Sequence, residues 1–166
     1  MENLVQWFME ALRGLSGEWV ALIISMVPLL ELRGGLLAAS LLNVDILRAV
    51  PLCVIGNIFP VPLILWFITP IFTAMKRTRL FRPLVEKIES KAMRKSEKIE
   101  KGMFWGLVLF VGIPLPGTGA WMGALIASLL DVPFKKAFPA ILLGILLATV
   151  IMSVVSYGLL GALLGH

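Results

Sequence analysis

The chain has 166 residues, of which 59% are hydrophobic and only 15% are charged, with a formal net charge of +5 and a mean hydropathy of +0.96. A soluble domain carries roughly a quarter charged residues, so this composition excludes an ordinary soluble domain. Three uncharged runs, residues 49–75, 103–130 and 137–165, each exceed the roughly 20 residues that span a bilayer core. We therefore predict an integral membrane protein, with residues 1–166 in a single membrane domain.

Residues 1–16 are predicted to form an interfacial amphipathic helix. Their apolar side chains share one helical face: Leu4, Trp7, Phe8, Leu12 and Leu15. An extension of the next helix fits this pattern equally well. Glu2 and Glu10 precede the first apolar run and no basic segment opens it, so a cleavable signal peptide is not expected.

Residues 17–75 contain a broken apolar segment followed by a long apolar helix. The broken segment, residues 19–44, consists of two short apolar pieces on either side of "ELRGG". At 1.5 Å per residue each piece covers roughly half of the hydrocarbon core. We therefore predict a re-entrant helical hairpin over residues 19–44, and a transmembrane helix over residues 46–75 that its prolines kink.

The stretch from residue 76 to residue 102 holds ten of the fifteen basic residues against four glutamates. Such an excess of positive charge is typical of a loop on the cytoplasmic side. We predict a basic linker helix that fixes the topology, and contact with anionic lipid headgroups is a second role consistent with its charge.

Residues 103–165 repeat the plan of the first half. A broken segment, residues 103–130, surrounds "PLPGTG", and a predicted transmembrane helix follows over residues 134–165. When the first half is shifted by 88 residues, eleven of 29 positions are identical, including prolines and glycines. We interpret this as an internal duplication of the kind found in many transporters. Asn43 and Asp131 stand at equivalent positions and are predicted to cap the long helices.

Two topologies are compatible with these lengths. Each broken segment either crosses the membrane, which gives four spans, or returns to its own side as a re-entrant hairpin. Non-helical backbone at membrane depth is stable only where protein or a water-filled cavity supplies hydrogen-bond partners for its N–H and C=O groups. Because two hairpins entering from opposite faces would bring both breaks to one shared cavity, we favour the re-entrant arrangement.

The motifs "ELRGG" and "GIPLPGTGAWMGALIA" resemble the small multidrug export proteins of prokaryotes over nearly the whole chain. More distantly, the plan is similar to that of the DedA superfamily, which includes polyprenyl-phosphate translocases and lipid scramblases. The resemblance implies an all-α integral membrane fold, an inverted repeat of a re-entrant hairpin plus a transmembrane helix, and transport with Glu31 as an essential acid. One departure is clear: DedA relatives carry an arginine in the second hairpin, whereas residues 103–130 hold no charge.

The two breaks are predicted to form one site that binds substrate and protons. Ionisable groups at the bilayer centre cost roughly 2.5–3.5 kcal/mol each and therefore mark functional sites; a structural salt bridge between Glu31 and Arg33 is the alternative. Half-helices are expected to begin near Gly34 and near residues 118–120, with Thr118 as an N-cap, and their free N–H groups would favour an anion. The predicted site residues are Glu31, Arg33, Gly34, Gly35, Pro116, Gly117, Thr118 and Gly119.

These features predict a transporter or flippase that moves an amphiphilic anion of the lipid-phosphate or polyprenyl-phosphate type, coupled to protons. A proton-coupled exporter of hydrophobic cations, with Glu31 as the counter-ion, is one alternative, and a non-transporting membrane scaffold is another. An enzyme is not expected, because no acid pair or activated nucleophile is present. We expect no cofactor, metal or nucleic acid; the expected partners are membrane lipids and a second copy in a homodimer. The expected location is a prokaryotic cytoplasmic membrane, crossed several times.

Overall fold

The computed structural model describes residues 14–76, 82–83, 85–87, 90, 102–115 and 117–159, and these residues form helices and turns without a strand. Residues 1–13 of the predicted N-terminal helix, most of the basic linker, Pro116 and residues 160–165 of the predicted second transmembrane helix lie outside the described residues. The helices are α2 (Gly17–Met26), α3 (Glu31–Leu41), α4 (Ile46–Ile58), α5 (Pro60–Lys76), α7 (Met103–Gly112), α8 (Ala120–Leu129), α9 (Phe134–Ser153) and the π-helical η2 (Val154–Leu159).

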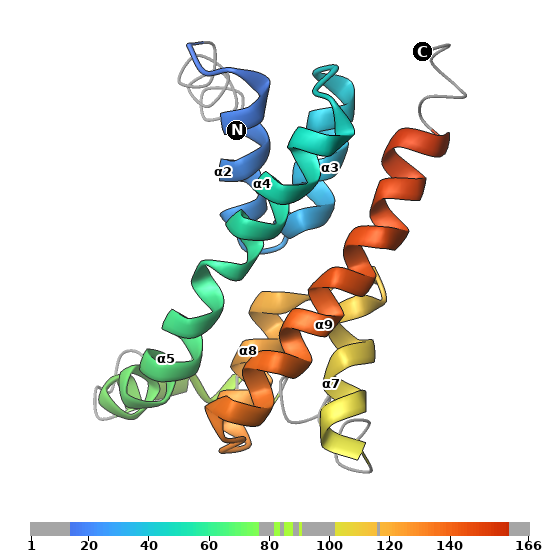
Figure 1. Ribbon diagram of the computed structural model, residues 1–166. Helices are drawn as coiled ribbons and strands as arrows, with labels where there is room; N and C mark the ends of the chain where they lie inside the picture. Colours follow the sequence, from blue (N-terminus) through green and yellow to red (C-terminus); the bar gives the residue numbers. More distant parts are fainter. Residues whose placement is uncertain are drawn as a thin grey trace.

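Two short antiparallel helix pairs occupy opposite ends of the molecule. The pair α2–α3 lies at one end and the pair α7–α8 at the other, and the turns that close the two pairs face each other near the centre (Figure 1). The longer stretches α4–α5 and α9 run past both pairs along the length of the molecule (Figure 1). This arrangement brings the two predicted breaks together, although they are far apart in the sequence.

Among the residues that the structure describes, two stretches are long and apolar enough to cross a membrane, Ile46–Ile68 and Phe134–Gly158. The first contains a break at Phe59, between α4 and α5. Pro60 and Pro62 lack the backbone N–H that would continue the helical ladder there, which explains the break. The predicted kink in this helix is therefore confirmed, whereas α9 continues without interruption to Ser153.

The corners that precede the two long helices have the same backbone geometry at a separation of 88 residues. Asn43 and Asp131 both adopt positive φ, at 55° and 52°. The N–H of Val44 donates to the carbonyl of Ala39 at 2.9 Å, and the N–H of Val132 donates to that of Ala127 at the same distance. The duplication seen in the sequence therefore extends to local structure.

The predicted capping role of Asn43 and Asp131 is wrong. The residue that caps α4 is Asp45, whose carboxylate accepts a hydrogen bond from the N–H of Leu47 at 2.9 Å. The corresponding residue before α9 is Pro133, which has no capping side chain. Asn43 and Asp131 instead form the left-handed turn that ends the preceding helix, a conformation that Asn and Asp tolerate better than most residues.

In the described part of the chain, the core has two large clusters, each with side chains from both halves, and a small one around Ile126. One surrounds α2, α3 and α4 and includes Ala148 and Met152 of α9. The other surrounds α7, α8 and α9 and includes Val61 and Ile64 of α5. Each short helix pair therefore packs against the long helices of both halves, which fixes the position of one pair relative to the other.

Candidate functional site at the junction of the helix pairs

Glu31 is the first residue of α3, and its side chain reaches across to the other helix pair. The residue is only 4% exposed. Its carboxylate accepts hydrogen bonds from the backbone N–H groups of Ala120, at 3.2 Å, and Trp121, at 3.0 Å. Those N–H groups open α8, whose N-cap residue provides no side-chain hydrogen bond. Glu31 thus supplies the negative charge that a helix N-terminus attracts.

Gly119 makes this approach sterically possible. It precedes α8 with a φ of 123°, a conformation that residues with a side chain rarely adopt. A Cβ atom at this position would overlap the carboxylate of Glu31, with its Cδ at 2.7 Å. A glycine is therefore required here for two independent reasons, the backbone conformation and the contact with Glu31.

Arg33 forms the second link between the helix pairs. Its guanidinium donates one hydrogen bond to the carbonyl of Leu115 and another to the hydroxyl of Thr118, the latter at 3.0 Å. Within the described residues the ion pairs are Arg48–Glu18 and Arg82–Glu86, so Glu31 and Arg33 do not form the structural salt bridge considered from the sequence. The two charges instead bind different parts of the second break.

Thr118 does not have the predicted role of an N-cap, because Gly119 occupies that position. The hydroxyl of Thr118 accepts from Arg33 and lies 2.8 Å from the carbonyl of Leu115 and 2.9 Å from that of Ile113. It therefore closes the turn after α7 and fixes the carbonyl that Arg33 contacts. Thr118 nevertheless contacts a predicted site residue of the first break, Arg33.

The predicted start of the first half-helix near Gly34 is wrong, since α3 begins three residues earlier, at Glu31. Gly34 and Gly35 lie inside the helix, and the atoms nearest to them belong to the first half of the chain and not to the second break. A Cβ atom at Gly35 would lie 2.8 Å from the carbonyl oxygen of Ala21 and 3.0 Å from the sulfur of Cys53. Gly35 therefore allows α3 to pack closely on α2 and α4, which is the alternative role expected of small residues between membrane helices.

A cavity of about 250 Å³ opens beside the junction. Its walls are mostly apolar, and they come from the turn before α3, from α5 and from α8; the lining residues are Pro28, Leu29, Glu31, Ile64, Ile68, Gly117, Thr118, Trp121, Met122 and Leu125. Glu31 contributes the one ionisable side chain among them, whereas Arg33 is not part of the lining. The cavity therefore combines hydrophobic walls with a single carboxylate, a combination suited to an apolar molecule that carries a positive charge or a hydrogen-bond donor.

Sequence reasoning missed most of the cavity wall. Trp121 lines the cavity beside Glu31, and its indole nitrogen is buried without a hydrogen-bond partner. Ile64 and Ile68 come from α5, which the sequence marked only as a spanning helix. The position of Trp121 directly after "PGTGA" was the one signal that pointed to the break.

Comparisons with known proteins agree with a role in transport. Residues 31–151 match a sequence family described as "Putative small multi-drug export protein". The match begins at Glu31 and includes both breaks, the whole of the first spanning stretch and the second one as far as residue 151. No curated protein and no solved structure matches the chain. The more distant resemblance to the DedA superfamily stays a prediction.

Proposed function

The chain belongs to the small multi-drug export protein family, and from this premise we propose that it exports hydrophobic molecules carrying a positive charge in exchange for protons bound at Glu31. The observation that supports this proposal most directly is the cavity at the junction, whose apolar walls surround one carboxylate. A buried carboxylate in a hydrophobic cavity attracts an amphiphilic cation through its charge, while the walls accept the apolar remainder without demanding one particular shape.

Exchange follows if Glu31 holds either a proton or the cargo. The ionised carboxylate binds the N–H groups of Ala120 and Trp121 and retains lone pairs for a cationic cargo. A proton arriving at Glu31 removes the charge, weakens its attraction for the cation and allows the cargo to leave. Because the two ligands exclude each other, inward movement of protons drives outward movement of cargo.

An amphiphilic anion of the lipid-phosphate or polyprenyl-phosphate type is the second candidate cargo. It is supported by the cationic and N–H groups gathered at the same junction: Arg33, Ala120 and Trp121. A protonated Glu31 that turned away would leave the N–H groups of Ala120 and Trp121 free for a phosphate, and Arg33 would exchange the carbonyl of Leu115 for it. We rank this cargo second because Glu31 and the carbonyl of Leu115 already occupy the donors.

Uptake into proteoliposomes separates these cargoes. With a proton gradient imposed, we expect proteoliposomes that contain the purified protein to take up tetraphenylphosphonium, a lipophilic cation. We expect no transport of a short-chain fluorescent phosphatidic acid. Accumulation of the phosphatidic acid alone would establish the anion as cargo. Movement of neither probe would contradict both proposals and favour the scaffold considered from the sequence.

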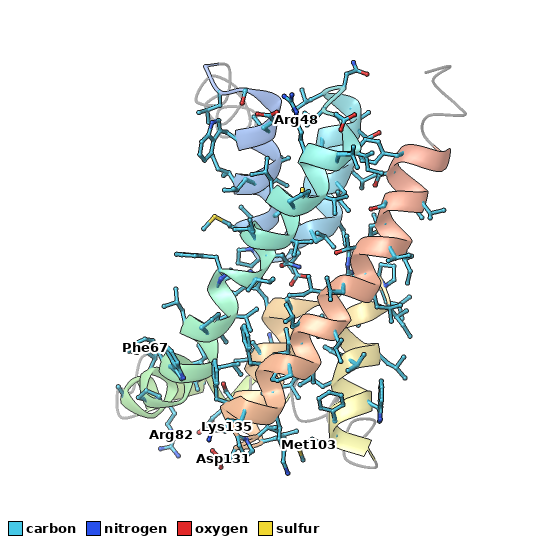
Figure 2. The ribbon with its side chains drawn as sticks, viewed as in Figure 1. Arg48, Phe67, Arg82, Met103, Asp131 and Lys135 are labelled. Atoms are coloured by element: carbon cyan, nitrogen blue, oxygen red, sulfur yellow. The ribbon has the colours of Figure 1, made fainter. Side chains whose placement is uncertain are left out.

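We further propose that both helix pairs are re-entrant hairpins in a cytoplasmic membrane, entering from opposite faces, with residues 76–102 on the cytoplasmic side. Arg48 and Lys135 lie at opposite ends of the molecule (Figure 2). In a Cys53→Ser background, a cysteine at position 48 should react with an impermeant maleimide from outside intact cells, and one at position 135 only in inverted vesicles. Reaction of both from the same side would establish four spans instead.

A further inference from the structure

A second cavity lies at the corner between α8 and α9, far from the junction. It has a volume of about 330 Å³ and is lined by Met103, Phe104, Leu107, Val132 and Lys136. Four of these five side chains are apolar, and the fifth is a lysine in the first turn of α9. Met103 and Lys135, next to Lys136, both lie at the end of the molecule opposite Arg48 (Figure 2).

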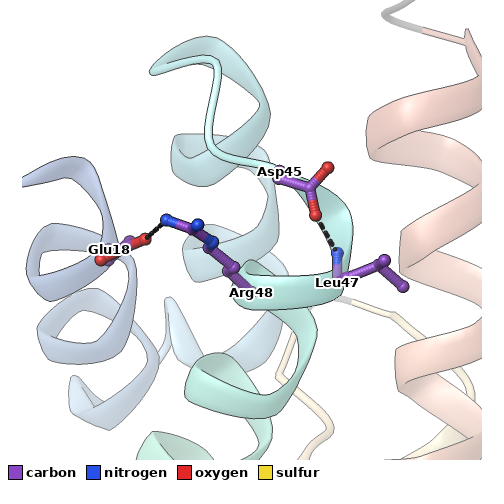
Figure 3. Close-up of polar contacts among 4 residues, drawn as sticks. All are labelled: Glu18, Asp45, Leu47 and Arg48. Atoms are coloured by element: carbon purple, nitrogen blue, oxygen red, sulfur yellow. Dashed lines mark hydrogen bonds and ion pairs between the residues drawn. The ribbon is translucent and has the colours of Figure 1, made fainter.

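The equivalent corner of the first half shows how such a cation is neutralised within the protein. Arg48 pairs with Glu18 of α2 at 3.1 Å. The carboxylate of Asp45 accepts a hydrogen bond from the N–H of Leu47, in the first turn of α4 (Figure 3). Two carboxylates of the protein therefore satisfy both the arginine and the start of the long helix.

The second corner keeps the cation and lacks both carboxylates. At a separation of 88 residues Lys136 corresponds to Arg48, whereas Gly106 replaces Glu18 and Pro133 replaces Asp45. The backbone is unchanged, because Pro133 has φ −56° and ψ 137° and Asp45 has φ −56° and ψ 135°. The cavity wall includes Phe104 and Leu107, which come from the same helix as Gly106.

Lys136 has no acidic partner in the part of the chain that the structure describes. Asp131 is at the same end of the molecule (Figure 2), but neither Lys135 nor Lys136 forms an ion pair with it. The first turn of α9 likewise has no side-chain cap. The corner thus presents an unpaired cation and free N–H groups at the mouth of an apolar cavity.

We propose that this cavity binds an anionic phospholipid. The headgroup phosphate takes the place that Glu18 and Asp45 have in the first corner, beside Lys136 and the start of α9. One acyl chain lies against Met103, Phe104 and Leu107. The site is at the end of the chain's basic linker, which residue 103 follows directly. The choice of an anionic lipid rests on the proposed cytoplasmic location of residues 76–102, the side on which anionic lipids attract positive charge.

Native mass spectrometry of the full-length protein, purified with equal amounts of phosphatidylglycerol and phosphatidylcholine, tests this proposal. We expect retention of one phosphatidylglycerol in preference to phosphatidylcholine. Lys136→Gln should lower that preference about tenfold, because a charge-assisted hydrogen bond to the phosphate is lost. Arg48→Gln, at the equivalent position of the corner with its own carboxylates, is the matched control and should leave the preference unchanged.

A second variant supplies the missing anion and keeps the lysine. Pro133→Asp fits the existing backbone and should accept a hydrogen bond from the N–H of Lys135, as Asp45 does from Leu47, so phosphatidylglycerol should again be lost. Equal retention of both lipids by the unmodified protein, or unchanged preference in both variants, would overturn the proposal. Displacement of phosphatidylglycerol by millimolar glycerol phosphate would show a site for soluble anions and also overturn it.

Discussion

Replacing Glu31 with glutamine will abolish proton-driven export of lipophilic cations. The amide has nearly the shape of the carboxylate and can still accept one of the two hydrogen bonds from Ala120 and Trp121. It carries no charge and exchanges no proton, so the cation loses its counter-ion and the proton its binding site. We expect affinity for tetraphenylphosphonium, measured by equilibrium binding in detergent, to fall about 10- to 100-fold.

The matched control is Glu18→Gln, a glutamate in the same half of the chain whose side chain is 37% exposed and pairs with Arg48. This variant should bind and transport the probe as the unmodified protein does. Glu31→Asp should bind the cation weakly, since its shorter side chain cannot hold the same position against α8. Unimpaired proton-driven transport by Glu31→Gln would show that Glu31 serves only to join the two helix pairs.

The sequence was sufficient to locate the junction. Glu31 and Arg33 are charges inside an apolar run, and burying such groups costs enough free energy that their presence indicates a specific environment. The second break followed from its prolines and glycines, which cannot continue a helix. These signals are local, and the structure does place Glu31 and Arg33 against the second break.

The partners of those charges could not be predicted, because they are set by tertiary packing. Glu31 contacts backbone N–H groups 89 and 90 residues away, and backbone groups carry no sequence signal. The start of α3 was misplaced for a related reason. Leu29 and Glu31 adopt positive φ, at 76° and 50°, which is uncommon for such residues. The contact of Glu31 with α8 favours this turn. The conformational preferences of the residues alone would have placed the turn at Gly34 and Gly35, which adopt positive φ more readily.

The difference between the two corners illustrates a further limit. The replacement of Glu18 by Gly106 and of Asp45 by Pro133 is visible once the halves are aligned. The consequence of these replacements for the charge of the corner can be inferred only if Glu18 is known to contact Arg48, thirty residues later. That contact is fixed by how α2 is rotated against α4, which residue spacing alone does not determine.

Gly119→Ala should be the most destabilising single substitution at the junction. The new Cβ atom would meet the Glu31 carboxylate, and alanine disfavours a φ of 123°. We expect a loss of about 2–4 kcal/mol in the free energy of unfolding, from backbone strain and from weaker hydrogen bonds to Glu31. Unfolding in mixed micelles of increasing dodecyl sulfate content measures it. Gly102→Ala, at an extended φ of −172° with open space around it, should change stability by no more than about 0.5 kcal/mol.

A double-mutant cycle with Glu31→Ala separates the two causes. Without the carboxylate the Cβ atom at position 119 has room, so only the backbone strain remains, about 1–2 kcal/mol. The difference between the two backgrounds, about 1–2 kcal/mol, is the coupling between Gly119 and Glu31. Equal losses in both backgrounds would mean that Glu31 does not rest against Gly119 in the membrane. If the coupling is present, Glu31 is held at the start of α8 in the resting protein, and cargo must bind to a carboxylate whose position the second helix pair determines.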